Sequence, residues 1–137
     1  MSEEWKRVRD EAEELSKFFE SEEVGNRQLR KLYNIFLAKL YEVEKEKKVG
    51  EKLNDWKKEL VIGLYRVRYN MVRKDKKGEN GEIDKLLKKF EMWEKDLLTL
   101  GSLAEFENWL RNKVDVLEVS YVLLSEKERD GKRKRSS

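Results

Sequence analysis

The sequence contains no cysteine, no histidine and no proline, and only seven glycines in 137 residues. Without cysteine, the chain forms no disulfide, offers no thiolate ligand to zinc and has no thiol nucleophile. Without histidine, it lacks the side chain that most often serves as a general base or a metal ligand. The absence of proline and the scarcity of glycine favour long, uninterrupted helices.

Long hydrophobic runs are also missing. No stretch is apolar over the length of a membrane span, and the N-terminal sequence MSEEWKRVRDE lacks the hydrophobic region of a signal peptide. We therefore expect a cytoplasmic protein with no membrane association. Charged residues make up 45% of the chain and apolar residues 38%, which is typical of helices with one buried stripe and a charged outer face.

Charge is unevenly distributed along the chain. Residues 25–78 carry a net charge of +9 (16 basic and 7 acidic residues), between net charges of −5 for residues 1–24 and −4 for residues 79–124. A basic block of this size creates a local field that attracts polyanions. The alternative is intramolecular, since acidic helices can pack beside basic ones and neutralise them.

Apolar residues recur at three- and four-residue steps along most of the chain, as on the buried face of a helix. In the first helix, this stripe consists of Trp5, Val8, Ala12, Leu15 and Phe19. The pattern predicts five helices, over residues 3–20, 27–48, 51–74, 82–98 and 102–128.

Helix boundaries are marked by capping residues and glycines. Ser2 is a plausible N-cap for the first helix, and the segment 102–105 (Ser-Leu-Ala-Glu) fits a capping box for the last. We predict an all-α fold, a single five-helix bundle formed by residues 1–129. Residues 130–137, which include the basic segment 132–135, are expected to form a disordered tail.

The helix at 51–74 has an unusual second face. Opposite its main apolar stripe, arginines alternate with aromatic and aliphatic side chains, among them Ile62, Tyr65 and Tyr69. Either this is a central helix covered by the bundle on both sides, or these three residues form an interface. The interface would bind another copy of the chain, or a nucleic-acid backbone with its bases nearby. We predict that they contact another subunit.

Basic residues on the second and third helices form candidate phosphate contacts. Arg27 and Lys31 are spaced along one outer face of the second helix, with Arg30 beside them, which suits a sugar-phosphate backbone bound without sequence reading. An ordinary solvated helix face explains the same row. The predicted RNA-binding residues are Arg27, Arg30, Lys31, Arg66, Arg73, Lys74, Lys76 and Lys77.

Enzymatic chemistry finds little support. Acidic pairs at helical spacing, such as Asp115 with Glu118, arise by chance among 29 carboxylates. No glycine-rich phosphate loop is present, and no nucleophile has a base to activate it. We predict no catalytic residue, no metal site and no cofactor.

Several short motifs resemble the small helical subunit of type III-A (Csm-type) CRISPR effector complexes. The segment 28–31 (Gln-Leu-Arg-Lys) matches a signature of an early helix in that family, and the segment 69–73 (Tyr-Asn-Met-Val-Arg) matches a Tyr-x-x-x-Arg element of its central helix. In the last helix the loosely corresponding residues are Ser102, Phe106, Glu118 and Tyr121. The resemblance spans roughly residues 26–124.

The resemblance implies a function as well as a fold. Subunits of this family stack in several copies along the guide–target RNA, bind its backbone without sequence preference, and leave catalysis to other subunits. The implied partners are guide and target RNA, the repeated backbone subunit, the large polymerase-domain subunit and further copies of the chain itself. The alternative is a helical protein–protein adaptor with no role in nucleic-acid binding.

Overall fold

The computed structural model describes residues 2–20, 25–46, 52–74 and 81–136, and the side chains of these residues except 20, 25, 74, 81–83 and 128–136. Within these ranges the chain forms helices and no strand. The helices are α1 (Glu3–Glu20), α2 (Gly25–Lys45), α3 (Leu53–Lys74), α4 (Gly81–Thr99) and α5 (Leu103–Ser136). The predicted all-α, five-helix fold is confirmed.

Observed helix boundaries lie near the predicted ones except at the end of the chain. The backbone of α5 is helical to Ser136, past the predicted end near residue 128. For residues 130–137, where the sequence predicts a disordered basic tail, the structure describes this backbone to Ser136 and no side chain.

Both predicted N-caps are present. Ser2 Oγ accepts a hydrogen bond from the backbone N–H of Trp5 at 3.3 Å, and Ser102 Oγ accepts one from the N–H of Glu105 at 3.2 Å. Glu105 in turn accepts from the N–H of Gly101 at 3.4 Å. These bonds satisfy backbone donors that have no partner inside the helix, so they define where α1 and α5 begin.

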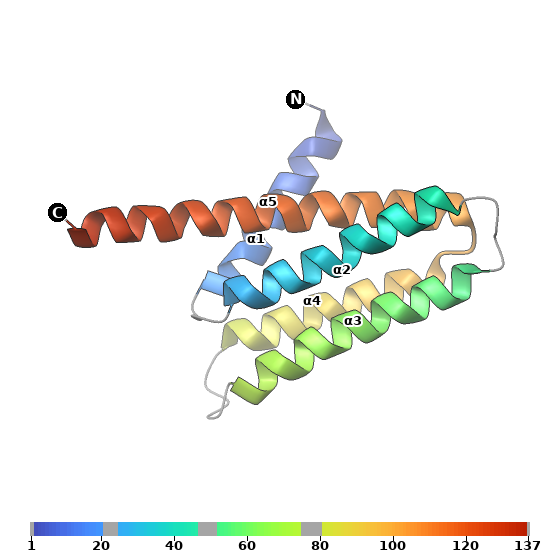
Figure 1. Ribbon diagram of the computed structural model, residues 1–137, viewed down its shortest axis with the longest axis horizontal. Helices are drawn as coiled ribbons and strands as arrows, with labels where there is room; N and C mark the ends of the chain where they lie inside the picture. The colour runs from blue at the N-terminus through green and yellow to red at the C-terminus, as the bar shows by residue number, and fades with distance from the viewer. Residues whose placement is uncertain (1, 21–24, 47–51, 75–80, 137) are drawn as a thin grey trace.

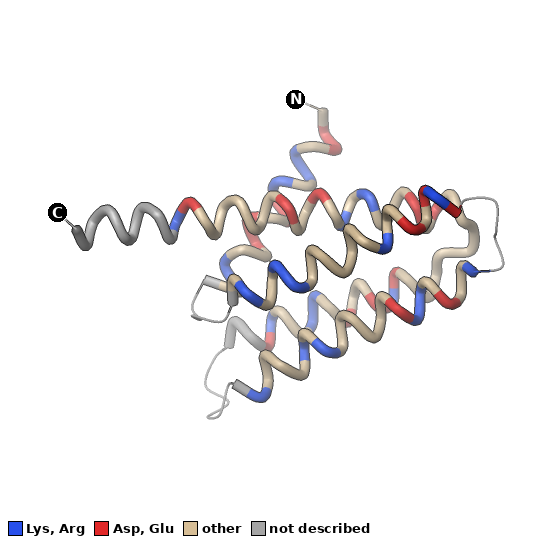
Figure 2. The backbone as a smooth tube through the Cα atoms, viewed as in Figure 1, with Lys and Arg blue, Asp and Glu red and all other residues tan. Residues whose placement is uncertain are grey.

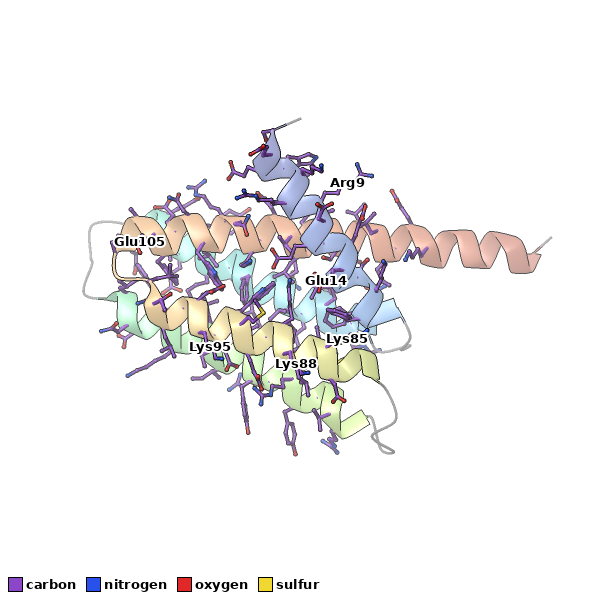
Figure 3. All side chains as sticks on the ribbon, turned by 180° about the vertical axis from the view of Figure 1, so that it is seen from behind. Arg9, Glu14, Lys85, Lys88, Lys95 and Glu105 are labelled. Carbon is purple, nitrogen blue, oxygen red and sulfur yellow. The ribbon has the colours of Figure 1, made fainter. Side chains whose placement is uncertain are left out.

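Helices α2, α3, α4 and the first part of α5 run lengthwise beside one another, and α1 crosses behind them (Figure 1). Seen from the other side, α1 lies across α5 (Figure 3). Short connections join α2, α3, α4 and α5 at alternating ends of the body, so successive helices are antiparallel. The start of α2 and the end of α3 therefore lie at the same end of the molecule.

The core takes side chains from every helix. Each apolar stripe packs inward, and the largest buried side chains are Phe19, Phe36, Trp56, Phe90, Trp93 and Phe106. Removing one such side chain from water stabilises the fold by roughly 1.5–3 kcal/mol. Trp5 is an exception, because it begins the predicted stripe of α1 but is 44% exposed. The N-terminal end of α1 projects past α5, beyond the reach of the core (Figure 1).

A partly buried carboxylate joins α1 to α4 and α5. Glu11 of α1 accepts a hydrogen bond from Trp93 Nε1 of α4 at 3.1 Å. Its two oxygens lie 3.0 and 3.2 Å from the ammonium of Lys113 on α5. That ammonium also lies 5.1 Å from the centre of the Trp93 ring, a favourable cation–π distance. One side chain thus satisfies polar groups from two other helices.

Close contact between α2 and α3 depends on Gly63. This residue is buried, and a Cβ atom added to it would lie 3.0 Å from Cγ2 of Ile35 on α2. Glycine inside a helix costs roughly 0.5–1 kcal/mol relative to alanine. At this position the missing side chain lets the two helices approach closely.

Glu42 links the other end of α2 to α3. It accepts hydrogen bonds from Lys39 Nζ at 2.7 Å and from Nε1 of the buried Trp56 at 3.1 Å. The hydrogen bond from Lys39 lowers the pKa of Glu42, against the raising effect of desolvation, and the bond from Trp56 lowers it further. The ionised form of Glu42 is therefore favoured by the fold.

Replacing Glu11 with alanine is expected to destabilise the protein by about 3 kcal/mol, because the ammonium of Lys113 and the indole N–H of Trp93 lose their shared partner. Urea unfolding followed by circular dichroism measures this loss. Glu13→Ala is the matched control: Glu13 lies on the same helix and its carboxylate is paired with Arg9 at the surface, so its loss should change stability by less than about 0.5 kcal/mol. Equal effects of the two substitutions would contradict the assignment.

Glu42→Gln is expected to lower the free energy of unfolding at pH 7 by about 1 kcal/mol. The pKa of Glu42 is lowered in the folded protein, so its stabilising effect is present above the ordinary glutamate pKa of about 4.3 and disappears as the pH falls through the folded-state value. The difference between variant and wild type should therefore shrink on acidification, as urea unfolding at a series of pH values would measure. In a Lys39→Met background the substitution should have a smaller effect. A difference that does not depend on pH would contradict this origin.

Candidate nucleic-acid interface

The first turns of α2 lie against the last turns of α3, because the two helices are antiparallel (Figure 1). A long hydrogen bond spans the two helices: Asn70 Nδ2 of α3 donates to Oε1 of Gln28 on α2, with a separation of 3.5 Å. Gln28 is only 6% exposed, so its amide lies in the contact between the helices. Residues near 27–31 on one helix and 66–73 on the other are consequently neighbours.

Five of the predicted RNA-binding residues are exposed at this end of the molecule. The apolar residues Leu29 and Leu32 take the inner face of α2, which turns the basic residues between them outward. Figure 2 shows basic residues at the start of α2 and at the end of α3. We call the exposed set the α2/α3 cation cluster, and it consists of Arg27, Arg30, Lys31, Arg66 and Arg73.

No member of the α2/α3 cation cluster forms an ion pair with another residue that the structure describes. Elsewhere in the same ranges, many cations do have carboxylate partners within 4 Å: Arg9, Lys39, Lys52, Arg68, Lys89, Arg111 and Lys113. Carboxylates of another helix therefore neutralise Arg68 of the basic block, which lies 3.7 Å from Glu91 and 3.9 Å from Glu94 of α4. Such neutralisation does not account for the cluster.

The second face of α3 is exposed, so the bundle does not cover this helix on both sides. Ile62, Tyr65 and Tyr69 are 50%, 60% and 57% exposed. They do not form one surface. The two tyrosines line a hollow of about 220 Å³ together with Lys31, Arg66 and Asn70, whereas Ile62 lies in a different groove.

That second groove runs between α3 and α4 and is mostly apolar. It has a volume of about 460 Å³, and its lining residues are Asn54, Lys57, Lys58, Val61, Ile62, Leu97 and Leu98. Leu98 is 77% exposed. Sequence reasoning missed this groove, because it forms between α3 and α4 and no pattern within either helix contains it.

The side chains of the other three predicted RNA-binding residues are not described by the structure. Lys74 belongs to the backbone of α3, but its side chain is outside the described set, and Lys76 and Lys77 lie outside the described residues. Sequence reasoning did not select Asn70 as a site residue. Its place beside Arg66 in the hollow follows from the pairing of α3 with α2, which no single-helix pattern contains.

No metal-binding arrangement was found in the described part of the chain. Among its Asp and Glu residues, no group of three or more lies close enough together to hold an ion. Nor is any described helix long and apolar enough to cross a membrane.

Comparison with protein-family models, with curated proteins and with solved structures found no match to this chain.

The different surroundings of Arg66 and Arg68 predict different effects on stability. Arg68→Ala removes two contacts with α4 and should lower the free energy of unfolding by about 1 kcal/mol. Arg66→Ala removes an exposed side chain that has no carboxylate partner in the described structure, and should change stability by less than about 0.5 kcal/mol. Thermal unfolding of the two variants measures the difference. A larger loss for Arg66→Ala would mean that Arg66 neutralises an acidic group within the fold.

Proposed function

We propose that this protein is a non-catalytic, RNA-binding small subunit of a type III-A CRISPR interference complex, acting in the cytoplasm. One observation carries the RNA-binding part. The cations of the α2/α3 cluster are exposed and lack carboxylate partners in the described structure, whereas seven other described cations are paired. The specific complex rests on the resemblance carried by the segments 28–31 and 69–73.

Binding of this kind does not depend on base sequence. Arginine and lysine side chains contact phosphate oxygens and release condensed counterions, which supplies affinity and fixes the position of the strand. The cluster comes from two rigid helices held together by the core and by the Gln28–Asn70 hydrogen bond, so its cations are arranged before RNA arrives. A rigid arrangement lowers the entropic cost of binding.

In the proposed complex several copies lie along the guide–target RNA. Each copy contacts its neighbours, the repeated backbone subunit and the large polymerase-domain subunit, and those other subunits carry out catalysis. The apolar groove between α3 and α4, with Ile62 and Leu98, suits a contact with another protein.

The same groove supports a second candidate function, that of a protein–protein adaptor with no RNA role. A groove of about 460 Å³ with a mostly apolar lining can receive the side chains of a partner helix. For such an adaptor, reversing charges in the α2/α3 cation cluster would leave RNA retention unchanged. The two functions therefore give opposite results in one experiment.

Arg30→Glu combined with Arg73→Glu is expected to weaken RNA binding about 10- to 100-fold, because two phosphate contacts become repulsive. Fluorescence anisotropy with a labelled single strand measures the affinity. With five phosphate contacts, the wild-type affinity should fall about 100-fold between about 50 and 200 mM salt. The variant should show a shallower salt dependence.

The matched control is Lys88→Glu combined with Lys95→Glu, which changes the net charge equally on the face of α4 seen in Figure 3. Both lysines are exposed, and the control variant should bind RNA nearly as tightly as the wild type. The same two variants should also be tested for retention of RNA in the assembled complex, because RNA binding can require the neighbouring subunits. A wild-type affinity independent of salt, or equal binding by the two variants, would contradict the proposal.

A further inference from the structure

Two solvent-exposed tyrosines lie beside the α2/α3 cation cluster. Tyr65 and Tyr69 are 60% and 57% exposed and lie one helical turn apart on α3, with Arg66 between them in sequence. Residues four apart on a helix project from the same face, with their Cβ atoms roughly 5–6 Å apart. The two rings therefore border the same hollow, whose other lining residues are Lys31, Arg66 and Asn70.

The size and chemistry of the hollow limit what it can bind. Its volume of about 220 Å³ is below the roughly 300–1,000 Å³ of pockets that enclose a drug-sized ligand, so it suits one small planar group held at an open surface. Two aromatic rings offer flat faces to such a group. Lys31 and Arg66 favour an anion beside it, and no carboxylate of a described residue lines the hollow.

These features favour a nucleotide over a protein surface. A purely apolar partner would bury Lys31 and Arg66 without compensating their charge, which is costly. A nucleotide supplies both complements, because its base stacks on an aromatic ring and its phosphate meets the cations. The groove of Ile62 and Leu98 lies apart from the hollow and has the apolar lining that a protein contact needs.

We propose that Tyr65 and Tyr69 stack on unpaired bases, so that this site binds a single-stranded segment of the RNA and not a base-paired one. This inference rests on the proposed RNA-binding function and makes it more specific. Bases within a duplex are already stacked on their neighbours, and the deep major groove of A-form RNA excludes side chains. The tyrosines, which the sequence predicts as a subunit contact, are reassigned here to the nucleic acid.

Stacking is tested with oligonucleotides that carry the same charge. Fluorescence anisotropy compares the full chain bound to a labelled single strand, to the same strand with abasic sites, and to a duplex. Base stacking on aromatic rings is worth about 5- to 150-fold in affinity per base. We expect the wild type to bind the intact strand at least about tenfold more tightly than the abasic strand. The duplex should bind more weakly than the intact strand.

Variants assign the effect to the two rings. Tyr65→Leu with Tyr69→Leu should abolish the preference for the intact strand and leave the salt dependence unchanged, because the cations remain. Tyr65→Phe with Tyr69→Phe should retain the preference, since a phenyl ring also stacks. Tyr41→Leu is the matched control, because Tyr41 is 64% exposed on α2 and does not line the hollow.

The outcomes separate the inference from the function on which it rests. Equal wild-type binding to intact and abasic strands, with a steep salt dependence, would overturn stacking and leave RNA binding in place. The abasic comparison needs no variant, so it decides the matter even if the leucine variant fails to fold. If the leucine variant binds RNA normally but self-associates less in sedimentation velocity, the tyrosines form a protein contact and the inference is wrong. Absence of wild-type binding to all the oligonucleotides would overturn both proposals.

Discussion

The arrangement of the helices depends on how the carboxylate of Glu11 is satisfied. A carboxylate that is partly removed from water between helices needs other groups to compensate its charge. Here Trp93 and Lys113 do so from two different helices, which specifies where α1 crosses α4 and α5. With α1 fixed behind the lengthwise helices, α2 and α3 keep their outer faces free. The exposed cations and tyrosines on those faces are a consequence of this packing.

Charge has two separate uses in this protein. Pairs such as Arg68 with Glu91, or Lys113 with Glu11, join one helix to another and leave little field outside the molecule. The α2/α3 cation cluster lacks such partners in the described structure, and its field extends into solvent. The net charge of +9 over residues 25–78 does not distinguish these uses, because it counts paired and unpaired cations alike.

The sequence predicts the helices well because the apolar stripe and the capping residues are local signals. Contacts between helices are not local. Glu11 and Lys113 are 102 residues apart, and nothing in either helix alone selects them from the other charged residues. Likewise, Arg66 and Arg68 look equivalent within α3, and only the position of α4 pairs one and leaves the other exposed. Trp5 fits the stripe of α1, but the pattern does not show that the helix extends past the core. The five cluster residues, predicted as phosphate contacts, are exposed in the structure, whereas Ile62 was grouped with tyrosines that face a different hollow.

Gly63, an uncharged residue, helps to set the distance between the α2 and α3 members of the α2/α3 cation cluster. Because a Cβ atom there would lie 3.0 Å from Cγ2 of Ile35, a larger side chain at this position must displace the side chain of Ile35 or move α3 away from α2. Any such movement would also separate Lys31 of α2 from Arg66 of α3, which line one hollow. The size of residue 63 thus influences how far apart the cations of α2 and α3 lie. A substitution there would change how well their spacing fits the phosphates of a polyanion, although no charge is altered.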